Sequence, residues 1–183
     1  NRLSHAFDDM TRRLRAAFRD VEAAQDELEQ KVAQRTEELR EANDELERLS
    51  RQDSLTGLAN RRRFDPDLRE EWLRARRSGE PLTLVMCDLD YFKAYNDRYG
   101  HTRGDEVLVK VARVVQSELR RSTDLAARYG GEEYALILPN TSAADAQAVL
   151  AQIRAGLASL GLVHEASPFG RITMSFGIAC HQA

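Results

Sequence analysis

Hydrophobic residues in the first 52 positions recur at steps that alternate between three and four, with charged residues on both sides of them. The stretch contains neither glycine nor proline, since the first of each are Gly57 and Pro66. It predicts one helix, roughly 75 Å long at about 1.5 Å per residue. So narrow a seam is typical of a coiled coil, because a helix on a globular core carries a wider stripe. The seam positions are Leu3, Phe7, Met10, Leu14, Ala17, Val21, Ala24, Leu28, Val32, Arg35, Leu39, Ala42, Leu46 and Leu49.

The seam has one irregularity near its middle. Two steps of four residues follow each other, from Ala24 to Leu28 and from Leu28 to Val32, and Arg35 then takes a core position. Such an insertion locally unwinds a supercoil, so the two halves need not share one register. The alternative is a single amphipathic helix folded back on its own domain. The narrow seam and its charged flanks favour a helical dimer.

From Asp53 onward the pattern changes to strands and helices separated by turns. Asn60 is a candidate N-cap for a helix to about Arg77, although Pro66 lies in its early turns. The uninterrupted apolar run 82–87 predicts a central strand covered on both faces. The other predicted elements are a helix over 104–120, strands over 125–129 and 134–138 around a tight turn, a helix over about 143–159 and a strand over 172–179. The predicted fold class is α/β, a central mixed β-sheet flanked by helices and preceded by a long dimeric coiled-coil helix.

Charge and cysteine content narrow the functional classes. The 27 basic and 30 acidic side chains nearly balance, so the net charge does not favour binding to nucleic acid or to a membrane surface. Cys87 and Cys180 stand in apolar runs and are predicted to be free thiols of a reducing compartment. No apolar run approaches the roughly 18 residues of a transmembrane helix. Because the sequence begins at Asn1 rather than Met, we expect a longer parent protein whose membrane anchor would lie upstream.

Acidic residues gather at two places where the surroundings are apolar or glycine-rich. Asp88 and Asp90 end the predicted central strand, and Glu132 and Glu133 occupy the predicted hairpin turn. If the two strands are neighbours, these carboxylates converge and need protons or a divalent cation to coexist. Carboxylate oxygens with an open site suit Mg²⁺, which substrate phosphates usually complete. Each pair alone is compatible with solvated surface, but together they predict a metal–nucleotide site.

Four segments, in order, resemble the motifs of the GGDEF-domain diguanylate cyclases. Residues 128–134, Arg-Tyr-Gly-Gly-Glu-Glu-Tyr, are similar to the family signature, and residues 53–61 to its entry motif. Residues 88–97, followed by Gly100-His101 and Gly104-Asp105, resemble its nucleotide-binding stretch. The resemblance covers 53–183, whereas 1–52 is the coiled-coil stalk. Residues 2–10 also look like the last helix of a HAMP signalling module.

The resemblance implies an enzyme that condenses two GTP into cyclic di-GMP and two pyrophosphates. It assigns two Mg²⁺ (or Mn²⁺) ions per active site to Asp88, Glu132 and the carbonyl of Leu89, with Glu133 completing the acidic cluster. Glu132 is also the implied proton acceptor. Lys93 would stabilise transition-state charge, and the backbone amides of 89–93 would cradle phosphates.

Further residues are implied to bind substrate and product. The implied substrate-binding set is Phe92, Lys93, Asn96, Asp105, Arg128, Gly130 and Gly131, in which Asn96 and Asp105 read guanine. Arg128 either faces phosphate or pairs with an acidic neighbour. Arg121 and Asp124 match the family's inhibitory product site, because an Arg fork suits guanine and phosphate, although a plain surface ion pair is the alternative. The second arginine of that site aligns with Gln152, two residues before Arg154.

Two departures from the family are visible. Tyr134 replaces the usual Phe and adds a hydroxyl that needs a partner. The sequence also stops at Ala183, before the last helix of the family, which bears a Lys and an Arg that help bind phosphates.

The implied partners are GTP, cyclic di-GMP as product and inhibitor, and a second copy of the chain through the coiled coil. No nucleic acid is expected, and a membrane only through the upstream segment, so we expect a cytoplasmic domain of a protein anchored in the bacterial inner membrane. The competing functions are a degenerate module that senses GTP or cyclic di-GMP without turnover, and a purely structural dimerisation rod. Asp88, Glu132 and Glu133 favour the enzyme.

Overall fold

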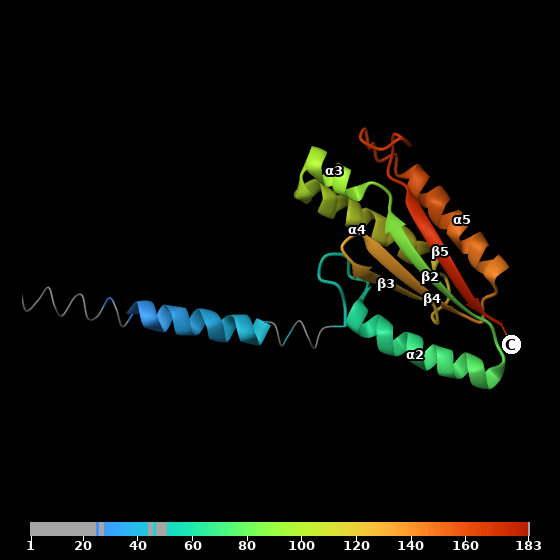
Figure 1. Cartoon of the computed structure of the whole chain (residues 1–183), viewed down its shortest axis with the longest axis horizontal. Helices are drawn as coiled ribbons and strands as arrows, with labels where there is room; N and C mark the ends of the chain where they lie inside the picture. Colours follow the sequence, from blue (N-terminus) through green and yellow to red (C-terminus); the bar gives the residue numbers. More distant parts are fainter. Residues whose placement is uncertain (1–24, 26–27, 44–45, 47–50, 183) are drawn as a thin grey trace, which may run out of the picture. The chain divides into compact units, whose positions relative to one another are not determined.

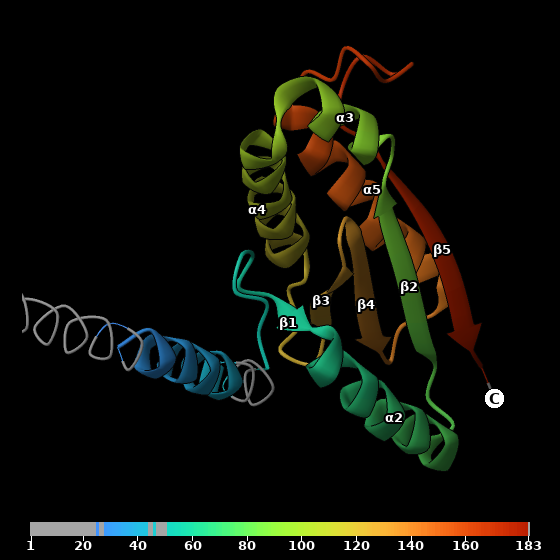
Figure 2. The same ribbon diagram turned by 60° about the vertical axis from the view of Figure 1, so that its left-hand side comes forward.

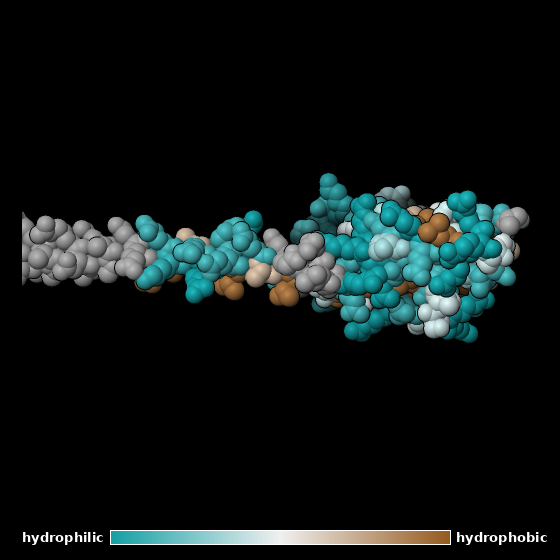
Figure 3. Space-filling model, turned by 90° about the horizontal axis from the view of Figure 1, so that it is seen from below, coloured by the Kyte–Doolittle hydropathy of each residue, from teal (hydrophilic) through white to brown (hydrophobic). Residues whose placement is uncertain are grey.

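The computed structural model describes residues 25, 28–43, 46 and 51–182, and the chain divides into two compact units, Asn1–Leu49 and Ser50–Ala183 (Figure 1). Residues 28–43 of the first unit are helical, as predicted. Its described seam residues Leu28, Val32, Leu39 and Leu46 are between 58% and 70% exposed. Figure 3 shows hydrophobic side chains along this helix, which leaves them available to a partner. The HAMP-like stretch 2–10 and the seam before Leu28 lie outside the described residues.

A five-stranded sheet forms the centre of the second unit, in the order β1-β3-β4-β2-β5. β1 runs parallel to β3, and the other neighbouring strands are antiparallel, so the sheet is mixed as predicted. The strands are β1 (Ala59–Asn60), β2 (Leu82–Leu89), β3 (Leu125–Gly130), β4 (Glu133–Pro139) and β5 (Met174–His181).

Helices cover both faces of this sheet (Figure 2). The helices are α2 (Arg61–Ser78), α3 (Phe92–Tyr99), α4 (His101–Glu118) and α5 (Ala143–Ser159). Val85 and Leu89 of β2 are buried in one core cluster with residues of α3, α4 and α5. Leu82 of β2 lies in a second cluster with Phe64 of α2. Successive strand residues thus meet different cores, which explains the uninterrupted apolar run.

Most predicted boundaries agree with the structure. The Asn60 side chain accepts a hydrogen bond from the Arg63 backbone amide, and α2 continues through Pro66. α4 begins at His101, three residues earlier than predicted, and α3 was not predicted at all. Cys87 and Cys180 are free thiols, as expected. Within the described residues, no helix is long and apolar enough to cross a membrane.

Candidate active site

The acidic residues converge because β2 and β4 are neighbours. Asp88, at the end of β2, pairs across the sheet with Glu133, the first residue of β4. The Leu89 amide donates a hydrogen bond to the Glu132 carbonyl at 3.4 Å. Two pairs of acids that are more than forty positions apart in the sequence therefore share one edge of the molecule.

Electrostatic repulsion is uncompensated at this cluster. Burial, followed by the nearby charges of Glu132, Glu133 and Asp90, raises the pKa of Asp88 above its usual value. Within the described part of the chain, no Lys or Arg forms an ion pair with Asp88, Glu132 or Glu133. A bound cation would relieve this repulsion.

The donor set fits a hard divalent cation held with help from its ligand. Among the described residues, no three His, Cys, Asp or Glu side chains are grouped so that they alone could hold a metal ion. Asp88, Glu132 and the Leu89 carbonyl offer oxygen donors only. Mg²⁺ favours this kind of incomplete oxygen site, since water and substrate phosphates supply its remaining ligands.

Asp90 has a different role from Asp88, although the sequence grouped the two. Thr173 and Ser175 each donate a hydroxyl hydrogen bond of 2.6 Å to its carboxylate. Its backbone amide donates to the Thr173 carbonyl at 3.0 Å. Asp90 therefore fastens the end of β2 to the segment that leads into β5.

The turn between β3 and β4 is tied to the entry motif by Arg128. The guanidinium donates through Nε to the Gly131 carbonyl at 2.8 Å, and through Nη1 to both carboxylate oxygens of Asp53 at 3.3 Å. Of the two alternatives for Arg128, the structure thus has the acidic neighbour. Burial alone would raise the pKa of Asp53. Hydrogen bonds from Thr56, together with the charge of Arg128, outweigh this effect and lower the pKa. A Cβ on Gly130 would come within 3.2 Å of a Glu133 carboxylate oxygen, so this glycine leaves space for the cluster.

A second feature beside the acids is the turn that connects β2 to α3. Tyr91 adopts a left-handed conformation, with φ 58° and ψ 25°. The family resemblance implied a phosphate cradle made by the amides of 89–93, but the amides of Leu89 and Asp90 donate to the Glu132 and Thr173 carbonyls. The amides of Tyr91, Phe92 and Lys93 have no acceptor among the described residues. Three amides at a helix N-terminus form a suitable anion site.

Asn96 contributes an unsatisfied polar group to the same region. Its Oδ1 is buried without a hydrogen-bond partner among the described residues. It lies against Gly104, where any side chain would collide with the amide group of Asn96. Asp105, the next residue, is exposed. Buried polar groups are normally paired, so this acceptor marks a place for a ligand donor.

Arg121 and Asp124 lie together but do not form the surface ion pair that was the alternative. Arg121 Nη1 donates to the Asn140 carbonyl at 3.3 Å and to the Thr141 hydroxyl at 3.2 Å. Burial raises the pKa of Asp124, whose Oδ1 is buried without a partner in the described structure. Arg154 of α5 lies with its guanidinium 4.8 Å from the centre of the Phe176 ring.

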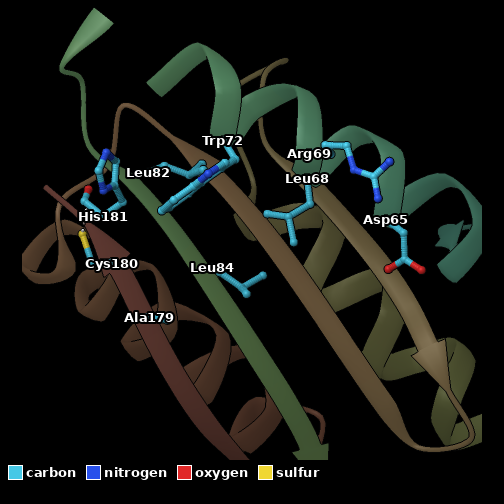
Figure 4. Close-up of a pocket in the computed structure, with 9 residues that line it drawn as sticks. All are labelled: Asp65, Leu68, Arg69, Trp72, Leu82, Leu84, Ala179, Cys180 and His181. Carbon is cyan, nitrogen blue, oxygen red and sulfur yellow. Dashed lines mark hydrogen bonds between the residues drawn. The ribbon is translucent and has the colours of Figure 1, made fainter. Parts of the chain in front are cut away.

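A large groove on the face of the sheet that α2 covers was not predicted. It has a volume of about 690 Å³ and lies between α2 and strands β2 and β5 (Figure 4). Leu68, Trp72 and Leu84 line it, and the Trp72 and His181 rings are 4.7 Å apart. None of the clustered acids faces this groove, so size alone does not identify the site. Its walls come from distant parts of the chain, which is why no local pattern predicted it.

Comparison with known proteins agrees with this geometry. Residues 50–183 match the family described as "Diguanylate cyclase, GGDEF domain". The chain is 36% identical to diguanylate cyclase VdcA of Vibrio cholerae over 91% of its own length and 49% of that protein. It is 33% identical to diguanylate cyclase DgcM of Escherichia coli, of which it covers 42%. The chain thus spans half or less of these relatives.

Solved structures share the fold. The coiled coil and GGDEF domain of DgcB from Caulobacter crescentus, in complex with c-di-GMP, is similar with a TM-score of 0.66 and 35% identity. That match covers 85% of this chain and 83% of the other. Diguanylate cyclase SiaD of Pseudomonas aeruginosa, in complex with its activator SiaC, has a TM-score of 0.64 and 37% identity, covering 99% of this chain and 70% of SiaD.

Proposed function

The chain belongs to the GGDEF family, and on that premise we propose that it is a diguanylate cyclase, which condenses two GTP into cyclic di-GMP and two pyrophosphates. One observation carries the proposal. A cluster of carboxylates without a cationic partner lies beside three free backbone amides at the start of α3. The first feature attracts divalent cations, and the second attracts phosphate.

Asp88, Glu132 and the Leu89 carbonyl would hold Mg²⁺ or Mn²⁺, two ions in each site. When bound, these ions neutralise phosphate charge and lower the pKa of the attacking 3′-hydroxyl. Glu132 would accept the proton of that hydroxyl, with Glu133 completing the acidic cluster. Lys93 is exposed and forms no ion pair in the described structure, so its ammonium is free to meet charge on the transferring phosphate.

The remaining residues would orient the nucleotide. Asn96 and Asp105 would bind the guanine, since a carboxylate can accept from its N1 and N2 donors. Phe92 is 5% exposed and packs in the core, so it would act through its backbone amide rather than its ring. Gly130 and Gly131 would let the turn approach the substrate closely. Arg128 would act indirectly, because its guanidinium already holds Asp53 and the Gly131 carbonyl.

Joining two GTP molecules requires two half-sites that face each other. We therefore propose a homodimer through the coiled coil, which the exposed Leu28, Val32 and Leu39 side chains support. Arg121 and Asp124 would bind cyclic di-GMP as an inhibitor. Since GTP is the substrate, the domain would work in the cytoplasm, with any membrane attachment of the parent protein through a segment upstream.

Incubation with GTP and Mg²⁺, followed by chromatography for cyclic di-GMP and pyrophosphate, tests the proposal. Calorimetry with a non-hydrolysable GTP analogue should be run in parallel. A protein that binds the analogue but forms no product under any divalent cation would be a nucleotide-sensing module, and the cyclase proposal would be wrong.

A further inference from the structure

The loop between α5 and β5 contacts the turn that carries the three free amides. We call residues 162–173 the clamp loop. Its two ends are joined, since the Ile172 amide donates to the Leu162 carbonyl at 3.0 Å and the His164 amide to the Gly170 carbonyl at 3.1 Å. Ser167 is buried and its amide donates to the His164 carbonyl. The clamp loop is therefore internally bonded and able to hold a neighbour in place.

His164 connects the clamp loop to Tyr91. Its side chain is fully buried, and Nε2 lies 3.1 Å from the Tyr91 carbonyl oxygen. Because a carbonyl can only accept, this contact requires the tautomer with a proton on Nε2. The ring also meets Tyr95 of α3 edge-on, with centroids 5.1 Å apart. The buried His164 side chain thus donates a hydrogen bond to the turn that carries the three free amides.

The clamp loop also forms hydrogen bonds with Asp90, the residue before Tyr91. The Thr173 hydroxyl donates to the Asp90 carboxylate, and the Asp90 amide donates to the Thr173 carbonyl. Beyond the turn, the Glu165 amide donates to the Tyr99 hydroxyl at the end of α3. Asp90, Tyr91 and the end of α3 are thus all fixed by one loop.

Tyr91 needs this support because of its backbone. The left-handed conformation is unfavourable for any residue with a side chain, by roughly 1–2 kcal/mol, and it persists only where the surroundings impose it. Rotation of Tyr91 toward a negative φ would turn its carbonyl away from both His164 and the Tyr95 amide. The same rotation would separate the directions of the amides of Tyr91, Phe92 and Lys93, which must converge to bind phosphate.

We propose that His164 is a positioning residue, which holds Tyr91 in its left-handed conformation and so shapes the turn that receives the phosphates of a guanine nucleotide. The inference rests on the proposed function for its ligand. The geometry of the clamp stands independently, and the test separates the two.

Two substitutions differ only in reach. In His164→Gln the side-chain amide nitrogen can take the place of Nε2, whereas in His164→Asn it is one carbon too short. Val163→Ala is the matched control, because Val163 is the adjacent clamp-loop residue, is 61% exposed and pairs with Arg171 of the same loop. Amide hydrogen exchange over residues 89–95, in nucleotide-free protein, reads the turn through Leu89, Asp90 and Tyr95, whose amides are hydrogen-bonded. Steady-state kinetics with GTP then measure how a change in the turn affects KM and kcat.

The Asn variant should exchange faster over 89–95, and its KM for GTP should rise roughly tenfold, the equivalent of about 1.4 kcal/mol. Its kcat should fall by a smaller factor. The Gln and Val163→Ala proteins should stay close to wild type. A merely structural role would lower the active fraction, which reduces kcat and leaves KM unchanged, and that result would overturn the proposal.

Unchanged exchange in the Asn variant, or equal behaviour of the Asn and Gln variants, would also overturn it. If the wild-type protein forms no cyclic di-GMP while exchange still rises in the Asn variant, the clamp stands and the cyclase proposal fails. Should the Asn variant not fold, Thr173→Val removes the hydrogen bond that the clamp loop donates to the Asp90 carboxylate, while Ser175 of β5 keeps its own. That variant should show the same rise in exchange, and wild-type exchange in it would reject the clamp.

Discussion

Asp88 lies at the end of β2, where partial burial and then the charges of three other acids raise its pKa. Asp88→Asn keeps the shape of the side chain but removes the charge and a metal-binding oxygen. We expect the cyclase rate to fall to less than a tenth of wild type, a loss of more than about 1.4 kcal/mol of transition-state stabilisation. Retention of a higher rate would contradict the metal assignment.

The same variant should be at least as stable as wild type at pH 7 without divalent cations. The pKa of Asp88 is higher in the folded than in the unfolded chain, so its ionised form disfavours folding above that pKa. The gain from Asn should therefore be present at pH 7 and shrink as the pH falls toward the unfolded value of about 3.8. Urea unfolding at several pH values measures it. Glu80→Gln, an exposed acid remote from the cluster, is the control and should show no such trend.

Arg121 provides the second prediction at this scale. Arg121→Ala removes the cation beside the buried, unpaired Asp124 oxygen, so it should weaken binding of cyclic di-GMP and relieve product inhibition. The initial rate should stay unchanged, because Arg121 contacts Asn140 and Thr141 rather than the acidic cluster. Calorimetry with cyclic di-GMP compares the two proteins. Equal affinities would reject the inhibitory site, and Arg120→Ala, an exposed neighbour, is the control.

The acids at the ends of β2 and β4 differ in how far their contacts could be predicted from the sequence. The convergence of Asp88 with Glu132 and Glu133 was predictable, because each pair ends or begins a recognisable strand. The hydrogen bonds of Asp90 were not predictable, because its partners Thr173 and Ser175 are 83 and 85 residues away in the sequence. Only the pairing of β2 with β5 brings them together.

At the scale of elements, a helical period over 17 or 18 residues made α2, α4 and α5 predictable, although α4 has no side-chain cap. The N-caps of α2 and α5 are Asn60 and Ser142, whose side chains accept hydrogen bonds from backbone amides in the first turn. α3 has no side-chain cap and starts at the left-handed Tyr91. Its eight residues are also too few to show a clear helical period. The clamp loop holds α3 in place through tertiary contacts, which no local signal reveals.

Tyr134 joins two elements across the core. Its hydroxyl is buried and donates to the Leu108 carbonyl of α4 at 2.9 Å, which supplies the partner that the extra oxygen needs. Burial raises the pKa of this phenol, so it stays protonated and able to donate. Tyr134→Phe should lower the free energy of unfolding by about 1 kcal/mol, the usual contribution of one such hydrogen bond. Urea titration tests this, with cyclase activity unchanged as the check that the site is intact; an increase in stability would contradict it.

At the scale of the whole molecule, the proposed dimer raises the question whether the stalk only tethers two copies or also controls their activity. The described seam contains a charge at Arg35, whose side chain is 81% exposed and pairs with Glu38 of its own helix at 2.8 Å. In a dimer that packs this seam, burying the guanidinium would be costly. Together with the two successive four-residue steps around Leu28, Arg35 weakens the segment that lies between leucine-rich ends.

We therefore predict that the helix pair has two registers, only one of which lets the catalytic domains meet productively. Arg35→Leu should tighten the dimer and favour one register, which changes the cyclase rate per dimer in either direction. Arg40→Leu is the matched control, because Arg40 lies off the seam and is 72% exposed, so the same gain in hydrophobicity should leave the dimer unchanged. Analytical ultracentrifugation gives the dimer affinity, and activity is measured at concentrations where every variant is fully dimeric. If Arg35→Leu dimerises more tightly while its rate per dimer equals that of wild type, the stalk is a passive tether and the two-register hypothesis is wrong.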